Sequence, residues 1–165
     1  MDRALIAPVA FALLLAACGG PQPRPYSDGS VDIVYEMEGE VTQLKALRGR
    51  PVVLVLLRVN ELTSELFIDA VVEAHDRMAG KIRFVVLTLD VNEAPLLEQY
   101  EEFHELPFPI GVAQWEVAQG NTPLGMIPIS PTTYMIDKRG KIVRMIPGAV
   151  PSAVILEEAK RLGWR

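Results

Sequence analysis

Two runs of branched apolar residues, each long enough for a buried strand, limit most strongly what this chain can fold into. Residues 52–59 (VVLVLLRV) and 82–89 (IRFVVLTL) are almost continuous in Val, Leu and Ile, which is typical of strands covered on both faces of a parallel sheet. Between them, residues 62–79 carry apolar side chains at helical spacing, and Gly80 is placed to end that helix. This strand–helix–strand pattern predicts an α/β domain.

The flanking segments continue the alternation of strands and helices. We expect further strands at residues 31–37, 108–113, 132–136 and 141–146, and further helices at 43–47, 92–103, 115–119 and 151–163. Asn92 is expected to cap the helix that follows it. The predicted architecture is a central mixed sheet with helices on both faces, closed by a C-terminal hairpin and a last helix.

Composition excludes several classes of protein. Half of the 165 residues are hydrophobic, so the chain is not disordered, and its length suits one domain. The net charge of −5 and the absence of a basic stripe in the sequence argue against nucleic-acid binding. The same charge argues against electrostatic attraction to a membrane.

The N-terminal residues have the features of an export signal. Residues 4–17 are apolar apart from Pro8, too few to span a bilayer core, which needs about 20, but suitable for a secretory signal. The run 15–18 (LAAC) resembles the lipobox of bacterial lipoproteins. That resemblance implies that residues 1–17 are removed and that Cys18 is acylated, and Gly19 after it implies the outer membrane, facing the periplasm. A simple secretory signal with an incidental cysteine remains the alternative.

The segment between this signal and the first strand is expected to be a flexible tether. Residues 18–30 contain three prolines and several glycines with few apolar side chains, so they cannot bury a core. The expected organisation is therefore a signal at 1–17, a tether at 18–30 and one domain at 31–165.

The C-terminal half carries the residues of a family resemblance. Residues 130–137 (SPTTYMID), followed by 138–143 (KRGKIV), resemble the corresponding segment of membrane-tethered, TlpA-type thiol–disulfide oxidoreductases. Residues 47–51 (LRGRP) and 107–110 (PFPI) support the match. The resemblance implies a thioredoxin-like fold and a cis peptide bond before Pro131.

The redox motif of that family is missing. Its Cys-x-x-Cys lies between the central strand and the next helix, which places it here at Leu62, Thr63, Ser64 and Glu65, to within a residue or two. Disulfide exchange requires a thiolate, and hydroxyl side chains cannot replace it. We therefore expect no dithiol chemistry, and expect Thr63 and Ser64 to cap the helix rather than to bind an anion.

Other polar residues are assigned to structure. Arg58, at the end of the central strand, is expected to pair with Glu61 or Glu65, with binding of a ligand carboxylate as the alternative. His75 and His104 lack the spacing of a metal pair or of a nucleophile–base pair. The glutamates of the second helix are expected to form a solvated face. The sequence thus predicts no catalytic residue, no metal site and no cofactor.

Three hypotheses about function follow. The first is a cysteine-less, membrane-anchored binding module, whose groove at Ser130 and Pro131 holds a protein or peptide partner of the cell envelope by strand-like addition. In this hypothesis the opposite side of the groove, called the lip, is formed by Leu62, Thr63 and Ser64. The second is a thiol–disulfide oxidoreductase, or redoxin, of the TlpA-like family. The third is a passive envelope lipoprotein.

Overall fold

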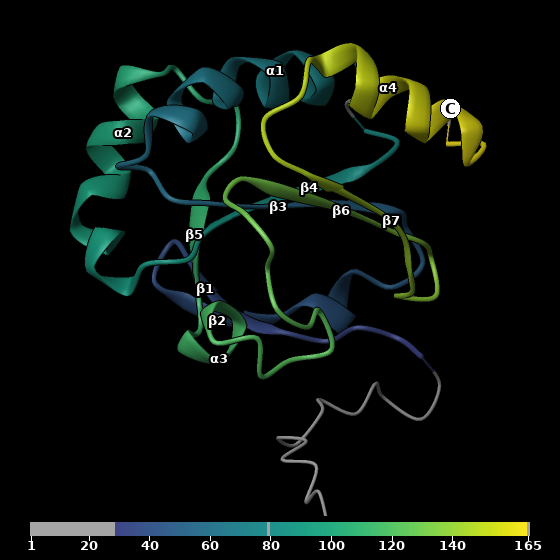
Figure 1. The fold of residues 1–165 in the computed structure, drawn as a ribbon, viewed down its shortest axis with the longest axis horizontal. Coiled ribbons are helices and arrows are strands. Elements are labelled where there is room, and N and C mark those ends of the chain that lie inside the picture. Colours follow the sequence, from purple (N-terminus) through teal and green to yellow (C-terminus); the bar gives the residue numbers. More distant parts are fainter. Residues whose placement is uncertain (1–28, 79, 165) are drawn as a thin grey trace, which may run out of the picture.

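The computed structural model describes residues 29–78 and 80–164, which form a seven-stranded mixed sheet with helices on both faces (Figure 1). The strands follow the order β2-β1-β5-β4-β3-β6-β7 across the sheet. Their bounds are β1 Val34–Met37, β2 Glu40–Gln43, β3 Val52–Leu57, β4 Arg83–Thr88, β5 Ile110–Ala113, β6 Thr132–Ile136 and β7 Ile142–Pro147. The predicted signal and the predicted lipidation at Cys18 lie outside the described residues, as does nearly all of the tether.

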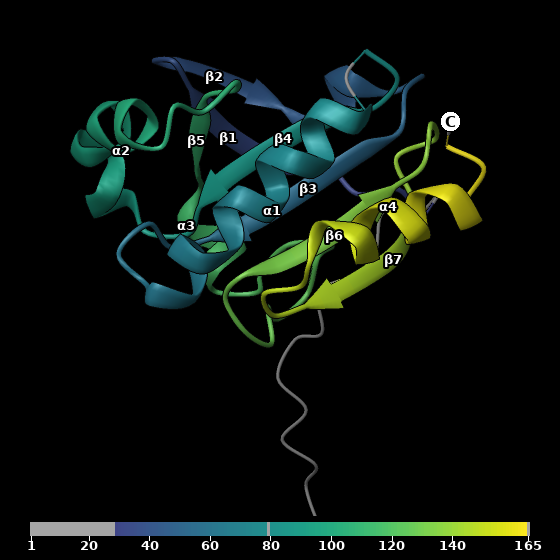
Figure 2. The same cartoon turned by 90° about the horizontal axis from the view of Figure 1, so that it is seen from above.

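The helices divide between the two faces of the sheet. Their bounds are α1 Leu62–Met78, α2 Leu97–Phe103, α3 Trp115–Ala118 and α4 Ser152–Arg161, with the 3-10 helices η1 Leu44–Leu47 and η2 Val91–Leu96. Figures 1 and 2 show α1 and α4 side by side on one face, with α3 and η1 on the other. None of these helices is long and apolar enough to cross a bilayer.

Strand β3 forms the centre of the core. It is parallel to β4 and antiparallel to β6, and all six of its residues are buried. Because side chains alternate along a strand, Val53 and Leu57 pack toward α1 and α4, while Leu54 packs toward the opposite face. This burial on both sides explains why the sequence of β3 is continuously apolar, and each such side chain stabilises the fold by about 1.5–3 kcal/mol.

Helix α1 covers the sheet with a narrower apolar stripe than its sequence predicts. Phe67, Val71 and Ala74 are buried, as expected from their spacing. Leu66, an apolar residue of the same helix, is 72% exposed, whereas Ser64 is fully buried. The stripe is therefore displaced at the start of the helix, and an apolar side chain is left in solvent there.

The structure differs from the sequence-based expectations in three local features. Strand β2 was not predicted, because its four residues include only one large apolar side chain, Val41, which is 68% exposed. The single helix predicted at 92–103 is divided into η2 and α2, since Pro95 lacks the N–H that a continuous α-helix needs. Asp90 rather than Asn92 caps η2, accepting the Asn92 N–H at 2.9 Å.

The direction of the strands defines two ends of the domain. At the carboxyl end, β3 finishes at Leu57 and β4 at Thr88, and α1 and η2 begin close by. At the amino end, β3 begins at Val52 and β4 at Arg83. Gly29, the first described residue, lies beside Lys141 of the β6–β7 turn and therefore at the amino end, which is the right-hand side of Figure 1. Helix α2 lies beyond the carboxyl end, on the left.

Candidate functional site

The candidate site is built at the carboxyl end, where residues 58–61 connect β3 to α1. Helix α1 begins at Leu62, and its first turn is closed by the Glu61 carbonyl, which accepts the N–H groups of Ser64 at 2.8 Å and Glu65 at 3.1 Å. Arg58 lies before this turn and pairs with Glu61 at 3.7 Å, as one of its predicted partners. The segment thus presents a helix start beside the ends of the buried strands.

The four residues predicted at the lost redox motif lie together on this first turn. Leu62 and Thr63 are exposed, while Ser64 is buried and its Oγ accepts the Arg58 N–H at 3.3 Å. The expectation that Thr63 and Ser64 cap the helix is wrong, because both lie inside the first turn and the Ser64 hydroxyl binds the preceding loop instead. Glu65 points elsewhere, to the hollow described below.

Ser130 and Pro131 lie at the neighbouring strand. The Ser130–Pro131 peptide bond is cis, as the resemblance implies. Leu56 pairs with Thr132 in the β3–β6 ladder, and continuation of that register places Ser130 opposite Arg58. The structure therefore brings the predicted groove residues next to the start of α1, although they are far apart in the sequence.

The polar groups of Ser130 have no hydrogen-bond partner in the described part of the chain. Its backbone N–H and C=O form no bond there, and its buried Oγ has no acceptor or donor. The residues around it are satisfied: the Thr132 hydroxyl donates to the Ile129 carbonyl at 2.5 Å, and the Pro131 carbonyl accepts the Gly148 N–H at 2.8 Å. Ser130 is thus a short edge that can pair with another strand.

A buried carboxylate holds the loop between β3 and α1 in place. Glu93, on η2, is only 4% exposed, and it accepts the N–H groups of Val59 at 3.0 Å and Asn60 at 3.3 Å. The Thr88 hydroxyl donates a further, short hydrogen bond to the same side chain. A carboxylate buried among three donors is well compensated for its lost hydration. Glu93 therefore positions the loop, and the sequence analysis missed it.

A hollow of about 340 Å³ lies between this loop and α2. Its lining includes Val59, Asn60, Leu96 and Phe103, and the last two are exposed apolar side chains. Leu62 and Leu66 add two exposed apolar side chains nearby on α1, at 73% and 72%. Apolar surface left in solvent around a concave site is typical of ligand and peptide sites.

A histidine–carboxylate pair forms the polar wall of this hollow. Nε2 of His104 lies 2.9 Å from Oε2 of Glu65, and the His104 side chain is only 14% exposed. Tyr100 packs on His104, and its hydroxyl is buried beside Glu65. Burial, with the nearby charge of Glu65, raises the pKa of the Tyr100 phenol. The sequence did not indicate this pairing, because Glu65 and His104 belong to different helical segments.

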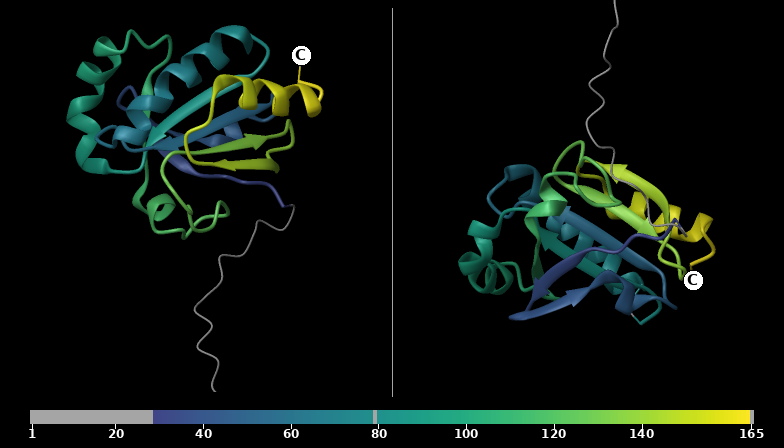
Figure 3. Two further views of the ribbon diagram at one scale, coloured as in Figure 1. Left: turned by 45° about the horizontal axis from the view of Figure 1, so that its top comes forward. Right: turned by 90° about the horizontal axis from the view of Figure 1, so that it is seen from below.

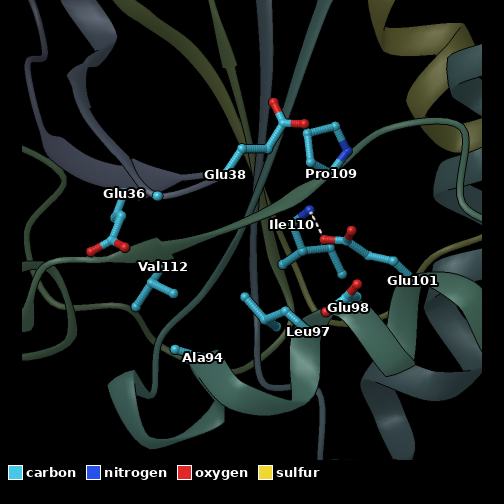
Figure 4. A pocket seen from close by; sticks show the side chains of 10 residues that line it. Glu36, Glu38, Ala94, Leu97, Glu98, Glu101, Pro109, Ile110 and Val112 are labelled. Carbon is cyan, nitrogen blue, oxygen red and sulfur yellow. Dashed lines mark hydrogen bonds between the residues drawn. The ribbon is translucent and has the colours of Figure 1, made fainter.

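A second hollow, of about 380 Å³, lies on the other side of α2 (Figure 4). Glu36, Glu38 and Glu98 line it, as does Glu101, whose carboxylate accepts the Ile110 N–H at 2.6 Å. The prediction of a solvated glutamate face is therefore wrong for Glu101. No group of three or more His, Cys, Asp or Glu in the described ranges can hold a metal ion. The second hollow thus adds negative charge to this end of the domain without forming a chelating site.

Comparison with known proteins agrees with the fold. No family model and no curated protein matches the chain. Solved structures do match: the DsbF homologue from Corynebacterium diphtheriae is 17% identical with a TM-score of 0.70, over 88% of this chain and 96% of that one. StoA from Bacillus subtilis is 18% identical with a TM-score of 0.62, over 78% and 96%. The exposed lipoprotein thioredoxin Etrx1 from Streptococcus pneumoniae is 18% identical with a TM-score of 0.60, over 79% and 98%.

These similarities establish the fold. The domain is thioredoxin-like, with the mixed sheet and helices found in thiol–disulfide oxidoreductases. The only cysteine of the chain is Cys18, so the cysteine pair on which that chemistry depends is missing from this scaffold.

Proposed function

We propose that this protein is a cysteine-less, thioredoxin-like lipoprotein of the bacterial cell envelope that binds an extended segment of a partner protein. Binding takes place at the Ser130 edge, beside the start of α1, and involves no electron transfer. The unpaired backbone N–H and C=O of Ser130 carry the proposal, because the backbone of an incoming strand supplies the complementary groups.

The surroundings of Ser130 indicate which segment fits. The 340 Å³ hollow shares Val59 and Asn60 with the loop opposite Ser130, so a strand crossing that loop can place an apolar side chain in it. Glu61, Glu65 and Asp69 make this surface acidic, and Arg58 is already paired. A segment with a large apolar residue flanked by Lys or Arg is complementary to this surface.

The proposed lipid anchor rests on residues 15–18 and on similarity, whereas the proposed outer-membrane location rests on Gly19 alone. The similar pneumococcal protein is an exposed lipoprotein, and the lipobox-like sequence of this chain ends at Cys18. Acylation at that residue would place the domain at a membrane surface, held by the residues before Gly29. Metabolic labelling with a palmitate analogue, lost in Cys18→Ala, tests the anchor separately.

Photocrosslinking in intact cells tests the binding edge. A benzoylphenylalanine probe at Leu62 is expected to give one major adduct, and the same probe at Lys160, on α4, is expected not to give it. Ser130→Pro removes one backbone donor, so we expect about a fivefold lower yield, which corresponds to one net hydrogen bond. Thr63→Trp places a bulky side chain at the start of α1, opposite Ser130, and leaves β6 unchanged. This substitution should lower the adduct yield as well.

The outcome that contradicts the proposal is equally specific. Circular dichroism must first show that Ser130→Pro and Thr63→Trp fold. If both variants then give the Leu62 adduct in the same yield as the unsubstituted chain, the Ser130 edge is excluded. The alternative, a thiol–disulfide oxidoreductase, is tested by insulin reduction with dithiothreitol: turnover above the buffer control by the soluble domain without Cys18 would establish it.

A further inference from the structure

Charged side chains are separated along the direction of the strands. Carboxylates gather at the carboxyl end, where the loop before α1 contributes Glu61, α1 contributes Asp69, and α2 contributes Glu98 and Glu102. The amino end instead presents six exposed basic side chains, which we call the basic end. They are Arg50, Lys81, Arg83, Lys138, Arg139 and Lys141.

Backbone contacts hold the loops of the basic end together. The Arg83 N–H donates to the Pro51 carbonyl at 3.0 Å, which joins the loop before β3 to the start of β4. The Gly49 N–H donates to the Lys138 carbonyl at 2.9 Å, which joins the same loop to the β6–β7 turn. The six basic residues therefore belong to one surface, although they come from three parts of the sequence.

This surface is not neutralised by carboxylates. None of its six basic side chains forms an ion pair with a residue of the described ranges. Of the nearby acids, Asp32 pairs with Lys45 at 3.4 Å, and Asp76 lies 3.2 Å from the His75 ring. Asp137 accepts the backbone N–H groups of the β6–β7 turn. The net charge of −5, which predicts no attraction to an anionic surface, is an average over two opposite ends.

The chain enters the domain at the basic end. The Val31 N–H donates to the Gly140 carbonyl at 2.7 Å, and Gly29 lies beside Lys141, so that a methyl group built on Gly29 would be 3.8 Å from the Lys141 Nζ. Figure 3 shows this entry beside the β6–β7 turn. Cys18 precedes Gly29 by eleven residues, which span at most about 40 Å when fully extended.

We propose that the basic end docks on an anionic bilayer surface, so that the Ser130 edge faces away from the membrane. This orientation rests on the envelope location proposed above, but the docking itself requires no acylation. Each Lys or Arg near an anionic bilayer typically strengthens partitioning about fivefold, and the effect weakens as salt is added. Arg50 and Arg83 also line a hollow of about 340 Å³, which is able to receive a lipid phosphate.

Vesicle partitioning of the full chain carrying Cys18→Ala tests the docking without the lipid. Lipid titration gives one partition coefficient on phosphatidylcholine and one on a 70:30 mixture with phosphatidylglycerol. The apolar N-terminal segment contributes to both coefficients, so their ratio reports the charge effect. We expect the coefficient on the phosphatidylglycerol mixture to be at least tenfold larger than that on phosphatidylcholine at about 20 mM salt. This ratio should fall toward one at about 500 mM salt.

Two matched charge reversals locate the surface. Arg83→Glu, at the start of β4, should lower the ratio about fivefold or more, whereas Arg58→Glu, at the opposite end, changes the net charge equally and should leave it within twofold. The triple change Arg50→Gln, Arg83→Gln and Lys141→Gln should abolish the preference. Circular dichroism shows whether each variant folds.

Three outcomes would overturn the docking proposal. The first is a ratio of partition coefficients near one for the Cys18→Ala chain, and the second is an equal decrease of that ratio in Arg83→Glu and Arg58→Glu. The third is displacement of the chain from vesicles by a 20-base-pair DNA duplex at about 150 mM salt. The last outcome would assign the basic end to nucleic acid. None of these results bears on the crosslink at Leu62, so failure of the docking and failure of the Ser130 edge are distinguishable.

Discussion

Gly111 has the closest surroundings of the glycines in the described part of the chain. It lies on β5 between β4 and β1, and a Cβ built there would be 2.6 Å from the Glu36 carbonyl oxygen and 2.8 Å from Cδ2 of Leu87. One of these atoms belongs to the backbone of the neighbouring strand, which cannot move without disturbing the ladder. The close approach of β1 to β5 therefore depends on the absence of a side chain.

Gly111→Ala is expected to lower the free energy of unfolding by about 2–3 kcal/mol, as for overpacking in a rigid core. Gly39→Ala is the matched control, because its φ of 77° is strained for alanine but no atom lies within 4 Å of the added methyl. The control should cost about 1 kcal/mol. Urea unfolding measures both, and an equal cost for the two variants would contradict the crowding argument.

The pairing of Glu65 with His104 illustrates what single residues in a sequence do not reveal. Both are ordinary polar residues of helical segments, separated by 39 positions. Their 2.9 Å contact depends on where η2 turns the chain before α2, and no local pattern specifies that turn. By contrast, Ser130 and Leu62 could be assigned to one site from the sequence, because the motif around Pro131 identifies the fold and the fold specifies which strand ends meet.

At the scale of elements, η2 holds the loop between β3 and α1 in place through hydrogen bonds, and this loop carries the candidate site. The Glu93 side chain of η2 bonds the backbone of Val59 and Asn60, so removal of the carboxylate leaves buried donors unsatisfied. Glu93→Ala is expected to lower the free energy of unfolding by about 3 kcal/mol, and Glu93→Gln, which keeps one acceptor oxygen, by less.

Glu98→Ala is the control for this substitution, since Glu98 is an exposed glutamate on the adjacent α2 and should change stability by no more than about 0.5 kcal/mol. Glu93→Ala should also lower the Leu62 crosslink, because the loop opposite Ser130 loses its support. Wild-type stability in Glu93→Ala would show that solvent replaces the carboxylate and that η2 does not hold the loop.

The elements differ in how far the sequence predicts them. Strands β3 and β4 and helix α1 are long and strongly periodic, so their residue types match the structure within one or two positions at most ends. Strand β2 and the division of 92–103 were missed, because β2 is held by pairing with β1 rather than by burial of its own side chains. Short elements that depend on a neighbouring strand leave little local signal.

At the scale of the whole molecule, the three tyrosines of the described residues are linked to alkaline stability. Burial raises the phenol pKa values of Tyr35, Tyr100 and Tyr134 above their usual value near 10. In the unfolded chain these phenols ionise first, so the stability they contribute is complete below pH 10 and is lost as the pH rises above it.

We therefore expect the urea midpoint to fall between about pH 9 and 11, with tyrosinate absorbance at 295 nm appearing together with unfolding. Tyr100→Phe removes one of the three phenols and should make this fall less steep. A midpoint in the native chain that is unchanged up to pH 11 would contradict the linkage.

The two outer strands have a consequence wherever many copies share a small volume. Strand β2 has four residues, and β7 is offset by an irregularity at Met135 and Ile136 and ends at Pro147, which has no N–H to offer. Neither border offers a long, regular row of donors and acceptors on which a second sheet can grow. Copies of this domain at high local concentration should therefore remain separate.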